Sequence, residues 1–97
     1  TIDTAKGPVA LQVEIADDLR HRLVARLRLA TRRQPRTQWA RNKVGEAVFI
    51  LAHEAQHARG VADEEKAYLM AMQTMVKVAV AAGIPQEYAT WIRAGYG

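Results

Sequence analysis

The chain has 97 residues, of which 49% are hydrophobic and 25% charged, and its formal net charge is +4. This composition predicts a single globular domain over residues 1–97 with one modest core, and it excludes a disordered chain. The chain contains no cysteine, which excludes both a disulfide framework and a thiolate zinc site.

The N-terminal segment carries a weak strand signal. The chain begins with Thr1 rather than methionine, which is consistent with a processed chain or with a fragment of a longer protein. In residues 8–15, large apolar side chains alternate with others, with Val9, Leu11, Val13 and Ile15 on one side and Ala10, Gln12 and Glu14 on the other. This alternation predicts one N-terminal edge strand, for which a packing arm is an equal alternative. No signal peptide and no apolar run of roughly 18 residues is present, so we expect no membrane segment and take the cytoplasm as the default location.

A basic helix is predicted next, from Asp17 or Asp18 as the cap to about Arg32. From Leu19 to Gly45 the chain has nine basic residues and no acidic residue, namely Arg20, Arg22, Arg26, Arg28, Arg32, Arg33, Arg36, Arg41 and Lys43. Such a block can bind a polyanion such as nucleic acid, or an acidic protein partner. A solvated helix face is the more ordinary interpretation, because Trp39 is the single aromatic residue near the block that could stack on a base.

The second long helix is predicted to begin after Thr37, a good N-cap, and to run to about Arg59. Its last part contains the motif H-E-x-x-H, in which His53 and His57 lie four residues apart and therefore on one face of the helix. Two imidazoles at that spacing can hold one divalent ion. Glu54 then lies close enough to reach a water molecule bound to the ion.

The motif needs a third metal ligand, because hydrolytic zinc sites use three protein ligands and leave the fourth position to water. Gly60 suits a helix end, and the chain can then return either Asp63 or Glu64 to the ion. The sequence leaves this choice open, since both residues also suit the start of another helix, Asp63 as its N-cap and Glu64 in its first turn. Histidine and carboxylate ligands favour Zn²⁺.

The stretch H-E-A-Q-H-A-R-G-V-A-D, residues 53–63, resembles the zincin metallopeptidases. It is similar to metzincins with Asp63 in place of the third histidine, whereas Glu64 would correspond to the third ligand of gluzincin-like proteins. Residues 44–83 also resemble small uncharacterised H-E-x-x-H proteins of actinobacteria and their phages. The resemblance implies that His53 and His57 bind zinc and that Glu54 is the general base in the cleavage of a peptide or protein substrate.

The rest of the chain predicts two more helices. One runs from Ala62 to Ala82 and is apolar almost all round, which indicates a central position. Gly83 ends it, and Pro85 begins a short final helix to about Ala94. The sequence thus predicts a mainly α fold of about four helices. The favoured function is a zinc-dependent hydrolase of peptide bonds. The alternative is a small basic binding or assembly protein in which the motif is structural or vestigial.

Overall fold

The computed structural model describes residues 17–96, with side chains from residue 20 onward. Over this range the chain forms four helices, α2 (Asp17–Arg32), α3 (Gln38–Ala58), α4 (Glu64–Ala81) and α5 (Gln86–Ala94). The predicted mainly α fold of about four helices is therefore confirmed, whereas the strand predicted at residues 8–15 lies outside the described residues. Within the described range, no helix has both the length and the apolar character that are needed to cross a membrane.

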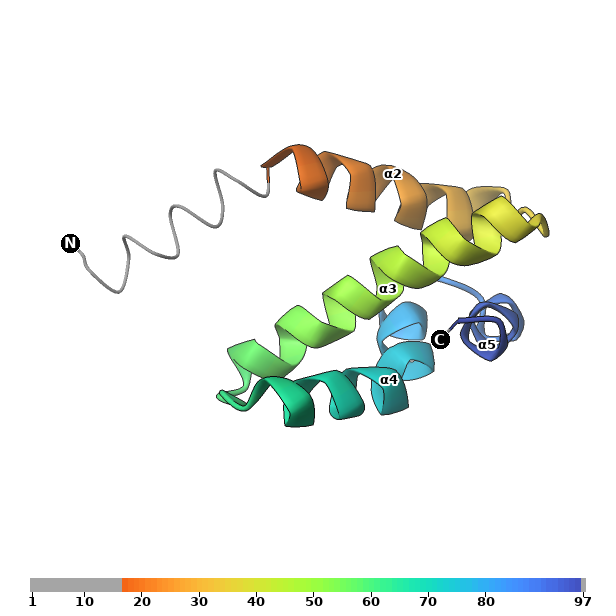
Figure 1. Cartoon of the computed structure of the whole chain (residues 1–97). Coiled ribbons are helices and arrows are strands. Elements are labelled where there is room, and N and C mark those ends of the chain that lie inside the picture. Colours follow the sequence, from red (N-terminus) through yellow and green to blue (C-terminus); the bar gives the residue numbers. More distant parts are fainter. Residues whose placement is uncertain (1–16, 97) are drawn as a thin grey trace.

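Helix α3 runs through the molecule, and the other three helices pack against it (Figure 1). Helix α4 folds back along the second half of α3 after a tight turn, α5 contacts both of them, and α2 packs against the first half of α3. The α2–α3 and α3–α4 connections lie at opposite ends of α3. Because α3 has 21 residues, these two ends are about 30 Å apart at 1.5 Å per residue.

The helix boundaries fall within two residues of those that the sequence predicted. The side chain of Thr37 accepts a hydrogen bond of 3.0 Å from the amide of Ala40, and that of Asp63 accepts one of 3.0 Å from the amide of Lys66. Each cap satisfies an amide that has no partner within its own helix. Helices α3 and α4 both end at a glycine in the left-handed region, with φ of 97°, where other residues are strained.

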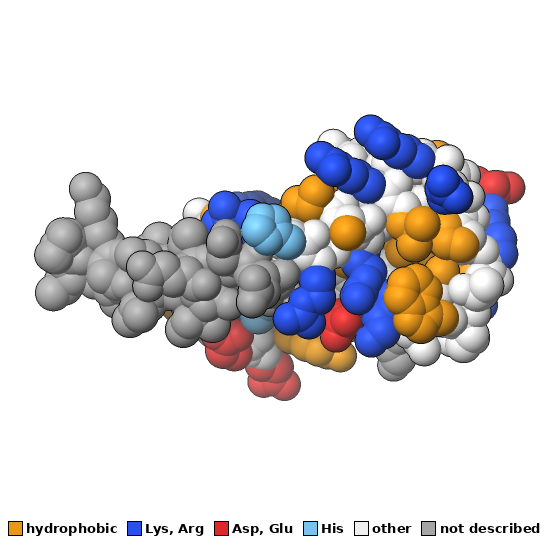
Figure 2. Space-filling model, turned by 90° about the horizontal axis from the view of Figure 1, so that it is seen from above, with side chains coloured by type: hydrophobic (Ala, Val, Ile, Leu, Met, Phe, Trp, Pro, Cys, Tyr) orange, Lys and Arg blue, Asp and Glu red, His pale blue; other side chains and the backbone are white. Residues whose placement is uncertain are grey.

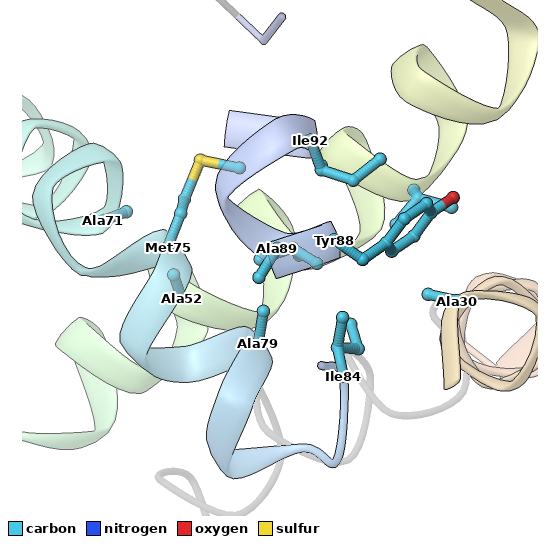
Figure 3. Close-up of a cluster of buried hydrophobic side chains, with 11 residues drawn as sticks. Ala30, Ala52, Ala71, Met75, Ala79, Ile84, Tyr88, Ala89 and Ile92 are labelled. Carbon is cyan, nitrogen blue, oxygen red and sulfur yellow. The ribbon is translucent and has the colours of Figure 1, made fainter. Parts of the chain in front are cut away.

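The core lies where α3, α4 and α5 meet, with α2 closing one side (Figure 3). Many of its buried residues are alanines, which allow the helix backbones to approach closely. The buried set is Ala30, Val44, Val48, Ala52, Ala71, Met75, Ala79, Ile84, Tyr88, Ala89 and Ile92. Tyr88 is the largest fully buried side chain, and its hydroxyl donates a hydrogen bond of 2.6 Å to the carbonyl of Pro35 in the α2–α3 connection.

Two arginines of the basic block contact α5, one from the α2–α3 connection and one from the first turn of α3. The guanidinium of Arg41 donates bonds of 3.1 and 2.8 Å to the carbonyl of Trp91 and lies 4.3 Å from the centre of its ring. Arg36 pairs with Glu87 at 3.0 Å and lies 4.9 Å from the same ring. Two of the nine basic residues therefore stabilise the fold through contacts within the chain.

Candidate metal centre

Two histidines of α3 and one glutamate of α4 converge at the α3–α4 connection. The Oε1 atom of Glu64 lies 3.2 Å from Nε2 of His53 and 3.3 Å from Nε2 of His57. Each of the three residues offers one ligand atom, and these atoms all lie within 4.8 Å of one another. His53, His57 and Glu64 could therefore hold a metal ion together.

The distances between the ligand atoms fit a tetrahedral metal site. With metal–ligand bonds of about 2.0–2.1 Å, two ligand atoms of a tetrahedral zinc site lie about 3.3 Å from one another. Both contacts of Glu64 with the histidines have this length. An ion pair between Glu64 and a protonated histidine would give similar distances, so the geometry is suitable for a metal without requiring one.

The turn after α3 brings Glu64 back to the histidines. Gly60 donates to the carbonyl of His57 at 2.9 Å, and Val61 donates to that of Gln56 at 3.1 Å. This pair of bonds, with a left-handed glycine, is the Schellman helix ending. It reverses the chain within a few residues, and α4 then begins beside the last turn of α3. The first residue of α4 is Glu64, which is why its carboxylate faces the two imidazoles.

The same turn orients the ring of His57. Its Nδ1 atom lies 2.8 Å from the carbonyl of Val61. Since a carbonyl oxygen can only accept, Nδ1 carries the hydrogen, and in the neutral ring the lone pair is then on Nε2, the atom that faces Glu64. Metal-binding histidines commonly donate a hydrogen bond from the N–H of their other ring nitrogen to such a carbonyl, which fixes the tautomer and the ring orientation.

The ring of His53 is supported by an aromatic cluster. The ring of Phe49, one helical turn earlier on α3, stacks on it with centres 5.7 Å apart and planes 10° apart. The ring centre of Phe49 in turn lies 5.2 Å from that of Tyr68 and 5.7 Å from that of Tyr96. The sequence did not predict this stacking, nor the contact of His57 with Val61. Neither leaves a signal in the residue types alone.

Glu54 shares the pocket of the three possible ligands. An open pocket of about 360 Å³ is lined by His53, Glu54, His57 and Glu64. The two histidine side chains are about one quarter exposed, at 26% and 28%, and Glu64 is 76% exposed. The pocket is thus polar and accessible from solvent, and it contains the carboxylate that the sequence analysis named as the general base.

Asp63 takes the other role that the sequence allowed. Its Oδ1 atom accepts the amide hydrogen of Lys66 and caps α4. It does not belong to the group of converging ligand atoms, which among the described residues consists of His53, His57 and Glu64. Of the two candidates for the third ligand, the structure therefore brings Glu64 to the histidines.

No protein-family model, no curated protein and no solved structure matches this chain. The fold and the site therefore define it only broadly, as a small helical protein with a His-His-Glu group that could hold a metal ion.

Proposed function

We propose that this protein is a zinc-dependent hydrolase that acts on peptide bonds, with zinc held by His53, His57 and Glu64. One observation carries the proposal: a carboxylate oxygen lies 3.2 and 3.3 Å from two imidazole nitrogens, and Glu54 lines the same pocket. Zinc is the favoured metal because the donors are neutral imidazoles and a carboxylate. The resemblance of residues 53–63 to the zincins supports the same metal.

The chain's own residues supply the rest of the chemistry. Three protein ligands leave a fourth coordination position open, as in hydrolytic sites. When bound, zinc would act as a Lewis acid that activates water and polarises the substrate carbonyl. Glu54 accepts a proton from the attacking water as its oxygen bonds to the carbonyl carbon. The same carboxyl group then delivers this proton to the amine nitrogen when the C–N bond breaks.

A peptide substrate is proposed for two reasons. The zincin resemblance of the H-E-x-x-H motif implies peptide-bond cleavage, with Glu54 as the general base. In addition, the pocket is open, and the two histidines are partly exposed. An open surface site suits a polymer that lies across it better than a small molecule, because small molecules are usually enclosed on most sides.

Metal content is the first test of this proposal. Protein purified without chelators is expected to contain about one zinc per chain by elemental analysis, and the His53→Ala variant is expected to contain none. Bound zinc should also raise the midpoint of thermal unfolding, because a ligand at 100 times its Kd stabilises the folded state by about 2.7 kcal/mol. Absence of zinc from the wild-type protein, even after zinc is added back, would contradict the proposal.

Turnover is the second test. With fluorescein-labelled casein as the substrate, Glu54→Gln is expected to lower kcat by about 100-fold or more, because general bases contribute about 10²–10⁴-fold to rates. Its zinc content and its circular dichroism should stay unchanged. Glu65→Gln, which removes an exposed carboxylate of the first turn of α4, is the matched control and should keep full activity. Unchanged turnover in Glu54→Gln would rule out this mechanism.

A further inference from the structure

We propose that the surface formed by α2 and the start of α3 binds single-stranded nucleic acid, with arginines contacting phosphates and Trp39 stacking on a base. This surface is distinct from the metal centre and does not depend on the proposed hydrolase activity. We call it the basic face and define it by Arg22, Arg26, Arg33, Trp39 and Lys43.

The charges of the chain are strongly segregated. Residues 19–45 hold nine of the 14 basic residues and none of the 10 acidic ones. In the view from the α2 side, Lys and Arg side chains gather over the described surface, and acidic ones are few (Figure 2). Among the described side chains, an acidic partner is found for Arg36 alone in this block. Arg36 and Arg41 contact α5, whereas the side chains of Arg22 and Arg33 are exposed.

Helix geometry arranges part of this charge beside an aromatic ring. Arg22 and Arg26 lie four residues apart on one side of α2. Arg33 directly follows the last residue of α2, and its amide still donates a helical hydrogen bond of 2.9 Å to the carbonyl of Leu29, so it continues the same side seven residues after Arg26. The guanidinium of Arg26 lies 5.5 Å from the ring centre of Trp39, which shows that this side of α2 faces the start of α3. Lys43 follows Trp39 by one helical turn and extends the positive surface along α3.

The exposure of Trp39 is the feature that favours single-stranded nucleic acid. It is 54% exposed, although a tryptophan of a small protein usually gains stability from burial. Single-strand binders combine a positive surface that follows the backbone with aromatic side chains on which bases stack. In a duplex the bases are already stacked on one another, so an exposed indole would gain little from it. An acidic protein partner would use the arginines but would not require the indole.

The basic face lies far from the metal centre. Trp39 and His53 are both on α3 and are fourteen residues apart, which corresponds to about 21 Å along the helix. The pocket of the metal centre also contains two acidic side chains, Glu54 and Glu64, whereas the basic face contains none. A strand bound at the basic face would therefore lie away from the pocket.

Binding can be measured by the fluorescence anisotropy of a labelled 12-nucleotide oligothymidine over a range of salt concentrations. Saturable, salt-sensitive binding by the wild-type protein is expected. The triple variant Arg22→Gln, Arg26→Gln and Arg33→Gln should bind more weakly, and the slope of log K against log[salt] should become less steep by about 2, which is about 0.7 per lost phosphate contact. A control that removes the same charge elsewhere, Arg59→Gln, Lys66→Gln and Lys77→Gln, should keep the slope.

The role of the indole is tested separately. Trp39→Ala should weaken oligothymidine binding by about 5- to 100-fold, within the range for loss of one stacked base, whereas Trp39→Phe should retain most of the affinity. His53→Ala should bind oligothymidine like the wild-type protein. Three results would overturn the proposal: no binding at low salt, equal losses in the two triple variants, or equal affinity for duplex DNA or heparin with no effect of Trp39→Ala. The last result would assign the surface to polyanions in general.

Discussion

The Oε1 atom of Glu64 lies 3.2 Å from Nε2 of His53, although the two residues belong to different helices. A Schellman ending at Gly60 produces this contact by turning the chain so tightly that α4 begins beside the last turns of α3. The adjacent Asp63 does not make the contact, because its side chain caps α4. Two neighbouring carboxylates thus have separate roles, and each role can be tested alone.

We predict that Glu64→Ala reduces metal binding and that Asp63→Ala reduces stability. Glu64→Ala removes a proposed ligand and should weaken zinc affinity by more than about 100-fold, above the range for groups that only orient a ligand. Asp63→Ala should keep the zinc but lower the free energy of unfolding of the metal-free protein by about 1 kcal/mol, the usual cost of losing an N-cap. Isothermal titration with zinc and urea unfolding measure the two quantities.

A matched control is Glu65→Ala, which removes the next carboxylate along α4. It should change neither zinc affinity nor the free energy of unfolding by a large amount, because Glu65 is exposed and surface substitutions usually cost less than about 0.5 kcal/mol. Loss of zinc in Asp63→Ala with retention in Glu64→Ala would show that the third ligand is Asp63 after all.

The fold was predictable from the sequence because its helix boundaries coincide with strong local signals. Thr37 and Asp63 cap helices through their own side chains, and Gly60 and Gly83 take a backbone conformation that other residues avoid. Such signals depend on a few consecutive residues. Long-range contacts left no comparable signal: the bonds of Arg41 with Trp91 join residues that are 50 positions apart.

The candidate metal centre was predictable only in part, for the same reason. The spacing of His53 and His57 within one helix determines that they share a face. The position of Glu54, next to His53 on the same helix, places its carboxylate near the same site. The third candidate ligand depends on the path of the chain after Gly60 and on which side chain the start of α4 uses as its cap. Residue types alone cannot decide this, since aspartate and glutamate are both suitable ligands and both suitable at a helix start.

The hydrogen bond between Tyr88 and Pro35 should matter for stability at neutral pH. The Tyr88 hydroxyl donates to the carbonyl of Pro35 at 2.6 Å, and the ring is fully buried. Tyr88→Phe leaves this carbonyl without its partner, so the free energy of unfolding should fall by about 1–3 kcal/mol. Tyr68→Phe, at a half-exposed position, should change it at pH 8 by less than about 0.5 kcal/mol.

The effect of Tyr88→Phe should also depend on pH. Burial raises the pKa of the Tyr88 phenol above 10.0, and the nearby Arg36 charge opposes part of this rise. A group whose pKa is raised on folding contributes stability that is complete below its unfolded pKa and is lost as the pH rises through its folded pKa. The difference between wild type and Tyr88→Phe should therefore shrink above about pH 10. Urea unfolding at pH 8, 10 and 11 measures it, and a constant difference would contradict the assignment.

Gln56 is a buried polar residue that we predict to reduce stability. It lies inside the H-E-x-x-H motif on the buried face of α3, one turn after Ala52, and is 2% exposed. Its Oε1 atom has no hydrogen-bond partner among the described residues. Because an unsatisfied buried polar group costs about 1–3 kcal/mol, Gln56→Met, which keeps the length of the side chain, should raise the free energy of unfolding by about 1 kcal/mol. Urea unfolding tests this against Gln73→Met, an exposed control on α4, and a loss of stability in Gln56→Met alone would show that the amide is satisfied.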